Sequence, residues 1–205
     1  RDVDAIVEVV RTFPDPNVIH VHGKINPDDD KQVINLELII ADLDNAQRRF
    51  GKVKDQLKGP KEKNLLAEQA LLSKVVSHLE QNKLLNSMER EDEEQILMRQ
   101  YNFLTDKPLM YVYNIDEKEM GTNMQLPDNT VAISAKLEAE LADVSPEELP
   151  TFLSELGITE TGLDRLITKS YELLKLITFI TTGPMETKAW TVTQGSKAPQ
   201  AAGVI

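Results

Sequence analysis

The sequence predicts an α/β fold in which a long helical segment is inserted into a sheet. Short apolar runs typical of buried strands lie at residues 3–10, 109–113 and 131–133. From about residue 32 to about residue 104, apolar residues recur at steps of three and four, which is the period of a helix. After residue 176 the period becomes two, which indicates a β-rich end of the chain.

The composition is that of an ordinary globular protein. The chain has 205 residues, of which 40% are hydrophobic and 28% charged, and this length is enough to bury a core. No apolar run approaches the roughly 20 residues of a membrane span, so no membrane partner is expected. Cysteine is absent, which excludes disulfides and thiolate chemistry. The net charge of −11 argues against direct binding of DNA by the chain as a whole.

Residues 11–30, after the first predicted strand, have no regular period. The run Asp28-Asp29-Asp30 fits the N-terminus of the next helix, where negative charge is favourable. A cation site is the alternative, but no glycine turn or distal glutamate follows at the spacing of a calcium loop. His20 and His22 alternate on a strand-like piece and could bind a metal, although no third ligand is in view.

Two long helices are predicted next, over about 32–57 and 61–85. The apolar stripe of the first is close to a heptad repeat and comprises Val33, Leu36, Ile40, Leu43, Ala46, Phe50, Val53 and Leu57. Gly59 and Pro60 separate the two helices, because proline cannot continue a helix. The pattern predicts an antiparallel hairpin that projects as a coiled coil, followed by a shorter helix around 89–104.

The hairpin carries the one candidate basic patch of the sequence. Its members are Arg48, Arg49, Lys52, Lys54, Lys58, Lys61 and Lys63. We favour a solvated helix face and turn over a nucleic-acid surface, because charge runs of this kind usually face water. His78 is expected to be a polar position on the second helix.

Two helices and a hairpin are predicted after the strand at 131–133. The first helix covers about 146–156, with Ser145 as its cap and Pro146 in its first turn, and the second about 161–175. Residues 177–193 then read as a β-hairpin, and the chain is expected to stay extended to its end. We place a domain boundary near residue 176.

Two polar loops follow neighbouring predicted strands and form the candidate ligand site. They are Asn114-Ile115-Asp116-Glu117 and Ser134-Ala135-Lys136. Open α/β folds bind ligands in the crevice at the carboxyl ends of their strands. The Glu117 carboxylate can accept hydrogen bonds from a purine edge, and the Asn114 amide can fix the loop or the base. The backbone C=O and N–H around Ile115 could match the amine and ring nitrogen of adenine.

The tetrad differs from the guanine-binding pattern of this architecture, which is Asn-Lys-x-Asp. Here Ile115 stands at the lysine position and Glu117 replaces the aspartate. The alternative interpretation is a helix-capping asparagine followed by a surface glutamate. The second loop on the next strand favours a purine site, because its N–H groups could reach the base and the Lys136 stem could lie along its face.

The groups that phosphoryl transfer requires are absent from this sequence. It contains no G-x-x-x-x-G-K-[ST] motif, no other glycine-rich phosphate loop and no recognisable magnesium site. It also lacks a cysteine nucleophile and a serine in a G-x-S-x-G elbow. We therefore assign no catalytic and no metal residue in this chain.

The sequence resembles the YchF, or Obg-like ATPase, family of P-loop proteins over nearly its whole length. The likeness runs through RDVDAIVEVVR (1–11), INPDDDKQVINLELIIADLD (25–44), FLTDKPLMYVYNIDE (103–117) and SAKLEAELADVSPEE (134–148). It is most specific over residues 162–205, which end in AWT…G…APQAAG and resemble the opening hairpin of the family's C-terminal TGS domain.

The resemblance implies a cytoplasmic, monomeric, ribosome-associated ATPase that uses ATP and Mg²⁺. Asn114 and Glu117 would flank the base, and Ile115 would contact adenine through its backbone. Ser134, Ala135 and Lys136 would form the second base-side loop. The connection from Glu117 to the next strand is shorter than usual for the family. Thr12 stands where cysteine is frequent, which we interpret as neutral packing.

The resemblance also divides the chain. Residues 1–31 and 106–176 would be parts of a P-loop, G-domain-like sheet, 32–105 a helical coiled-coil insertion, and 177–205 the start of a TGS domain. The phosphate loop and Mg²⁺ ligands are expected before residue 1, so we expect no hydrolysis from this stretch alone. The alternative is a non-catalytic module in which the helical hairpin binds a partner and the nucleotide crevice is vestigial.

Overall fold

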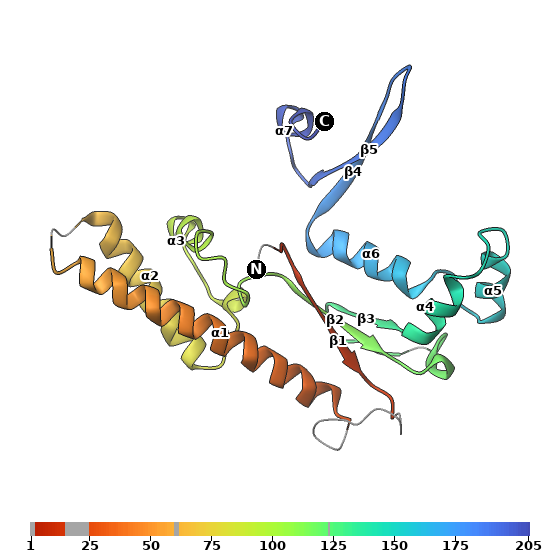
Figure 1. Cartoon of the computed structure of the whole chain (residues 1–205), viewed down its shortest axis with the longest axis horizontal. Helices are drawn as coiled ribbons and strands as arrows, with labels where there is room; N and C mark the ends of the chain where they lie inside the picture. Colours follow the sequence, from red (N-terminus) through yellow and green to blue (C-terminus); the bar gives the residue numbers. More distant parts are fainter. Residues whose placement is uncertain (1–2, 15–24, 60–61, 123) are drawn as a thin grey trace. The chain divides into compact units, whose positions relative to one another are not determined.

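The computed structural model describes residues 3–14, 25–59, 62–122 and 124–205. The fold is mixed α/β, as the sequence predicted, and it divides into two compact units (Figure 1). The first holds the described part of residues 1–6 and 26–108, and the second holds that of 7–25 and 109–205. Among the described helices, none combines the length and the apolar character needed to cross a lipid bilayer.

A helical hairpin of α1 (Pro27–Gln56) and α2 (Lys63–Glu80) dominates the first unit (Figure 1). The side chain of Asn26 caps α1, because its Oδ1 accepts hydrogen bonds from the N–H groups of Asp28 (3.2 Å) and Asp29 (3.5 Å). The acidic run 28–30 lies in the first turn. Its place at the helix N-terminus is therefore confirmed, where it interacts favourably with the helix dipole.

The core of this unit is built from residues of α1 that are seven positions apart. Ile39, Ala46 and Val53 are buried against a set of apolar residues that comprises Leu71, Leu72, Val75, Leu79, Leu85, Met98 and Phe103. The predicted stripe is wrong at its beginning, because Val33, Leu36 and Ile40 are 40%, 43% and 57% exposed. Ile40 lies on another face of α1 than its buried neighbour Ile39. Val33 and Leu36 lie earlier in α1, which has 30 residues against the 18 of α2, so the two helices cannot pair along the whole of α1.

The chain leaves the hairpin through a short 3₁₀ turn, η1 (Leu85–Ser87), and α3 (Asp92–Met98). The predicted helix over 89–104 is therefore too long. Asn102 adopts a left-handed φ of 51°, which a continuing helix does not allow.

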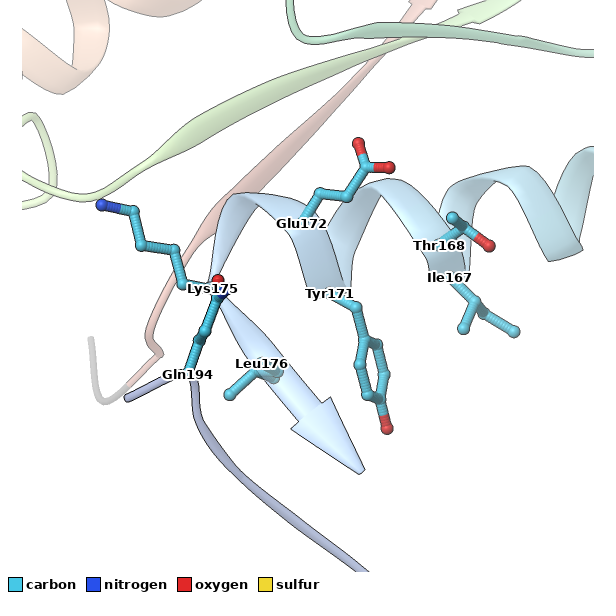
Figure 2. Close-up of a pocket in the computed structure, with 7 residues that line it drawn as sticks. All are labelled: Ile167, Thr168, Tyr171, Glu172, Lys175, Leu176 and Gln194. Carbon is cyan, nitrogen blue, oxygen red and sulfur yellow. The ribbon is translucent and has the colours of Figure 1, made fainter. Parts of the chain in front are cut away.

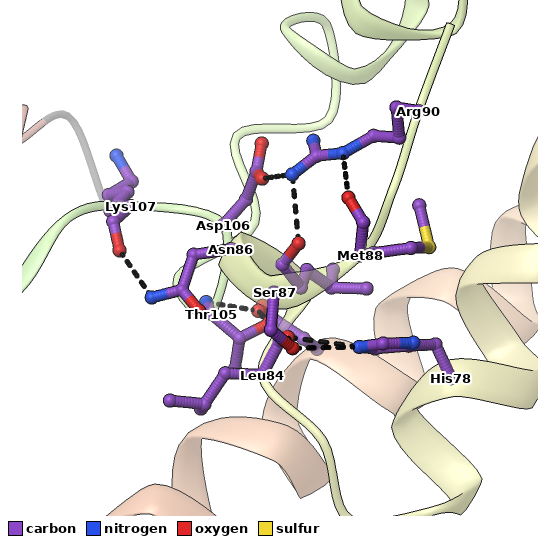
Figure 3. A network of polar contacts seen from close by, with 11 residues as sticks. His78, Leu84, Asn86, Ser87, Met88, Arg90, Thr105, Asp106 and Lys107 are labelled. Atoms are coloured by element: carbon purple, nitrogen blue, oxygen red, sulfur yellow. Dashed lines mark hydrogen bonds and ion pairs between the residues drawn. The ribbon is translucent and has the colours of Figure 1, made fainter.

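Hydrogen bonds hold this return segment together and also fix it to the hairpin (Figure 3). The Arg90 guanidinium bonds the Leu85 carbonyl at 2.8 Å and the Asp106 carboxylate at 2.6 Å. His78 on α2 lies 3.1 Å from the Leu84 carbonyl, so its role as a polar helix position is confirmed. The buried Asp42 accepts the N–H (2.7 Å) and hydroxyl (2.8 Å) of Thr105.

The second unit is organised by a three-stranded sheet in the order β1 (Ile6–Arg11), β2 (Leu109–Asn114), β3 (Thr130–Ile133). β2 and β3 are parallel, and their register pairs Tyr111 with Thr130 and Asn114 with Ile133. All four residues of β3 are buried. The carboxyl ends of β2 and β3 consequently meet at one edge of the sheet, as the sequence predicted.

Three helices follow β3: α4 (Ala135–Leu141), α5 (Leu149–Glu155) and α6 (Gly162–Leu173). Leu166 and Leu173 of α6 pack on a buried cluster of strand residues, which are Met110, Val112, Val131 and Ile133. A separate buried cluster joins α4 to α5 through Leu137, Leu141 and Leu153.

The predicted start of α5 is wrong. The helix begins at Leu149 rather than 146, with Glu148 as its N-cap and Pro150 in its first turn. The Ser145 hydroxyl donates to the Glu148 carboxylate (2.8 Å), and the Glu148 N–H closes a turn onto the Ser145 carbonyl (3.1 Å). Ser145 therefore stabilises a turn that precedes the helix and does not cap it.

The end of the chain forms an antiparallel hairpin of β4 (Leu176–Thr182) and β5 (Thr187–Thr193), as predicted. It does not stay extended, because a short helix, α7 (Ala198–Ala202), follows. Pro199 lies in the first turn of α7, where its missing N–H costs no helical bond. The domain boundary near residue 176 stays a prediction.

Candidate functional site

Asn114 joins the two predicted base loops. It is the last residue of β2, and its side-chain Oδ1 accepts a hydrogen bond of 3.0 Å from the N–H of Ala135 in the second loop. Its backbone carbonyl accepts the N–H (3.1 Å) and hydroxyl (3.0 Å) of Thr12. The amide thus fixes one loop against the other, while Thr12 holds the strand end from the opposite side.

Ile115 continues the strand pairing beyond the end of β2. Its N–H donates to the carbonyl of Ile133 at 2.9 Å, and the residue is only 3% exposed. The apolar side chain at this position therefore belongs to the core. Of the two backbone groups that the sequence suggested for adenine, the N–H is already used within the sheet.

The next residues form a capped turn, η2 (Glu117–Glu119). The Asp116 carboxylate accepts the N–H of Lys118 at 3.0 Å, and the Glu119 carboxylate accepts the N–H of Asp116 at 3.3 Å. Asp116 is thus committed to local structure. Glu117 is the first residue of this capped turn.

Glu117 and Lys136 connect the loops a second time. The Lys136 ammonium lies 2.8 Å from Glu117 Oε1 and 4.0 Å from Glu140. The two side chains are 38% and 68% exposed, so this pair lies at the surface. The hydrogen bond to Glu117 raises the pKa of Lys136, with a smaller contribution from the charges of Glu117 and Glu140.

Ser134 starts the second loop and is buried. Its hydroxyl oxygen accepts the N–H of Leu137 at 3.4 Å, which makes Ser134 the N-cap of α4. Ala135 and Lys136 are exposed in the first turn of that helix. The second loop is therefore the beginning of a helix, with an N–H donor and a cation next to the tetrad.

The sequence and the fold both match one family. A family model, YchF-GTPase_C, described as a protein of unknown function (DUF933), matches residues 176–205. Over its full length the chain is 41% identical to the ribosome-binding ATPases YchF of Bacillus subtilis (strain 168) and of Escherichia coli O157:H7. A solved structure of the Schizosaccharomyces pombe YchF GTPase matches with a TM-score of 0.85 and 28% identity, over 98% of this chain and 58% of that one.

This chain is similar to YchF proteins over its full length. It spans 59% of the length of the two bacterial relatives.

All six predicted site residues of this chain lie at the edge of the sheet where β2 and β3 end. Four make direct contacts between the loops, in the pairs Asn114–Ala135 and Glu117–Lys136. Ile115 and Ser134 support the loops from the interior. Their part in recognising a base stays a prediction.

Two residues at this edge were not identified from the sequence. Thr12 is a hydrogen-bond donor to Asn114, so its interpretation as neutral packing is wrong. Glu138, one turn into α4, accepts the N–H groups of Gly162 (2.7 Å) and Leu163 (3.2 Å) at the start of α6. The sequence contains no local signal for either contact, because the partners are 102 and 24 positions away.

Among the residues that the structure describes, no cluster of three His, Asp or Glu side chains is placed to hold a metal ion. His20 and His22, the other metal candidates, lie outside the described residues.

Three cations of the hairpin's basic patch pair with acids. Arg48 pairs with Asp44 at 2.9 Å, and Lys58 pairs with Asp55 at 2.8 Å. Arg49 lies 2.5 Å from the buried Glu68. Lys61 lies outside the described residues. The pairing favours the interpretation of this surface as a solvated helix face.

Two hollows of the second unit lie apart from the base loops. A groove of about 430 Å³ runs along α6 to β4 and is lined by Ile167, Thr168, Tyr171, Glu172, Lys175, Leu176 and Gln194. Figure 2 shows the side chains of Ile167 and Tyr171 on one side of α6, with that of Glu172 directed away from them. A smaller hollow of about 240 Å³ lies between β3 and α6. Neither is lined by a predicted site residue.

Proposed function

We propose that this chain carries the base-recognition site of an ATP-binding and ATP-hydrolysing P-loop protein. The observation that carries the proposal is the 3.0 Å hydrogen bond from the Ala135 N–H to Asn114 Oδ1. It joins the two base loops at the edge of the sheet where open α/β folds bind ligands. The names of the relatives, a ribosome-binding ATPase and a GTPase, support nucleotide hydrolysis by the whole protein.

Backbone chemistry at Ile115 favours adenine over guanine. Because its N–H is bonded to Ile133, the carbonyl is the group that remains for a base. The exocyclic amine of adenine is a donor that a carbonyl can accept. Guanine has an acceptor oxygen at the equivalent position, and two facing acceptors leave both without a hydrogen bond.

The ion pair at Glu117 favours the same choice. Guanine would offer its N1–H and N2–H₂ donors to a carboxylate, as in the Asn-Lys-x-Asp pattern. One oxygen of Glu117 is already bonded to Lys136, so guanine must compete with an ammonium group for it. Adenine has no such pair of donors and leaves the ion pair intact. The Lys136 stem would then lie along the face of the base.

Hydrolysis requires groups that we place outside this chain. A phosphate loop and the Mg²⁺ ligands would come from the part of the relatives' length that the chain does not cover. Mg²⁺ would neutralise charge on the β- and γ-phosphates during transfer. The residues of this chain bind and orient the base, and this stretch alone is expected to be inactive.

We also propose a ribosome partner and hence a cytoplasmic location for the whole protein, supported by the names of the bacterial relatives. A domain boundary near residue 176 is supported by the family match, which begins at that residue. A helical hairpin that projects as a coiled coil, a TGS assignment for the end of the chain and a monomeric state belong to the same proposal.

The experiment compares Asn114→Ala with Asn64→Ala in the full-length protein. Asn64 is an exposed residue of α2 and serves as a matched control. Loss of the Asn114 side chain frees the second loop, so ATP affinity is expected to fall by about tenfold, with no change for the control. Displacement of a fluorescent nucleotide measures this. Equal ATP affinities of the two variants would show that Asn114 does not contribute to the site. If the wild type does not bind ATP, the result would favour the non-catalytic module.

A further inference from the structure

Glu138 attaches the second base loop to a helix far along the chain. Its Oε1 accepts the N–H of Gly162 at 2.7 Å, and its Oε2 accepts the N–H of Leu163 at 3.2 Å. These are the first two residues of α6, whose N–H groups have no partner inside their own helix. One carboxylate thus satisfies two main-chain donors and also places negative charge at the positive end of α6.

Gly162 provides the space for this contact. A Cβ atom at that position would lie 2.8 Å from Glu138 Oε1 and 2.9 Å from the Ile133 Cγ2. Ile133 is the last residue of β3 and directly precedes the second base loop. The glycine is therefore required by the close approach of α6 to both Glu138 and the strand end.

The turn that Glu138 holds is the turn that carries the site contacts. Ala135 donates its N–H to Asn114, and Lys136 pairs with Glu117. α4 has only seven residues, and a helix of that length has little stability of its own. Its side-chain cap is long, at 3.4 Å from Ser134 Oγ to the Leu137 N–H. The position of its first turn consequently depends on contacts made to other elements.

We propose that Glu138 is a positioning residue for base recognition. By holding the first turn of α4 to the start of α6, it sets the position of the Ala135 N–H and of the Lys136 ammonium relative to the tetrad. Glu138 itself does not touch the base. This inference rests on the proposed function, because it assigns a purpose to the exact placement of the same two loops.

The test uses three variants of the full-length protein. Glu138→Ala removes both acceptors, and Glu138→Gln keeps one oxygen but sets an NH₂ group against the second N–H. Gly162→Ala keeps the glutamate at position 138 but displaces its carboxylate, because the added Cβ would lie 2.8 Å from Oε1. Glu155→Ala, an exposed position on α5, is the control.

Calorimetry measures ATP and GTP binding, steady-state kinetics separate KM from kcat, and amide exchange without nucleotide follows residues 134–137. We expect Glu138→Ala and Gly162→Ala to weaken ATP binding by about tenfold, since each breaks charged hydrogen bonds. The preference for ATP over GTP falls, KM rises, kcat stays unchanged and exchange accelerates. Glu138→Gln is intermediate, and the control behaves as wild type.

Unchanged ATP affinity in a folded Glu138→Ala or Gly162→Ala protein would overturn the inference, even if amide exchange accelerates. Should Glu138→Ala fail to fold, Glu138→Gln decides: a raised KM at constant kcat supports the positioning role, and an unchanged KM refutes it. A wild-type protein that does not bind ATP would refute the proposed function together with this inference. Wild-type binding that no variant alters refutes the inference alone.

Discussion

At the scale of single residues, the Glu117–Lys136 pair leads to a prediction for the pH dependence of the proposed base site. The hydrogen bond to Glu117 raises the pKa of Lys136 above its ordinary value of 10.5. Lys136 therefore keeps its positive charge at every pH below 10.5 and loses it only in more alkaline solution. ATP affinity of the full-length protein should therefore stay constant from about pH 7 to about pH 9. Titrations across this range measure it, and a steady loss of affinity with rising pH would contradict the role of Lys136.

In the proposed site, the length of the Glu117 side chain would decide which base is favoured. In Glu117→Asp the shorter carboxylate is withdrawn from Lys136, which weakens the ion pair and makes the carboxylate more available to the N–H donors of guanine. We expect the ratio of ATP to GTP affinity to fall by roughly fivefold, the value of one modest hydrogen bond. Competition between the two nucleotides measures the ratio. Glu155→Asp is the control, and an unchanged ratio would exclude Glu117 from the choice of base.

Residue chemistry could be predicted where it is local, and not where it depends on a distant partner. The pattern N-x-x-E and the second loop pointed to six residues that do lie at one edge of the sheet. The sequence showed only that Ile115 stands where the Asn-Lys-x-Asp pattern has a lysine. The structure shows that this side chain is 3% exposed, so a lysine would place its charge in the core.

At the scale of elements, the buried Asp42 ties α1 to the return segment of the hairpin. The N–H and the hydroxyl of Thr105 both donate to Oδ2 of Asp42. Asp42→Ala therefore leaves two buried donors without partners. We expect a loss of unfolding free energy of about 2 kcal/mol or more. Asp44→Ala removes only an exposed ion pair with Arg48 and should cost less than about 1 kcal/mol.

Chemical denaturation compares the two variants, and amide exchange at Thr105 gives a local reading. Exchange at this amide should accelerate in Asp42→Ala, because its N–H is the group that Asp42 accepts. Equal stabilities of the two variants would show that the buried carboxylate does not hold the segment.

Helices and strands were predictable because periodicity reports burial, whereas their ends and partners were not. The strands at β1, β2 and β3 and the hairpin at β4 and β5 follow from apolar runs and alternation. The exposed start of α1 was missed because no helix period reveals how long the opposing helix is. The contacts of Asp42 and Glu138 join residues 63 and 24 positions apart, which no local pattern encodes.

At the scale of the whole molecule, the net charge of this chain bears on the proposed ribosome partner. A net charge of −11 gives this chain no broad attraction to RNA, and three cations of the basic patch, Arg48, Arg49 and Lys58, are paired with acids. A protein that makes few contacts to RNA phosphates has an affinity that falls only weakly as the salt concentration rises. We expect co-sedimentation of the full-length protein with ribosomes to weaken by less than about tenfold when salt is doubled. A steeper loss would indicate binding dominated by phosphate contacts.

The claim that the two loops select adenine is tested most directly by calorimetric titration of the full-length wild-type protein with ATP and with GTP. The Ile115 carbonyl favours the 6-amine of adenine over the 6-oxygen of guanine, and the Glu117–Lys136 pair disfavours the N1–H and N2–H₂ donors of guanine. The expected result is ATP affinity at least about tenfold above GTP affinity, the worth of one hydrogen-bond mismatch. Equal affinities, or tighter binding of GTP, would contradict the account.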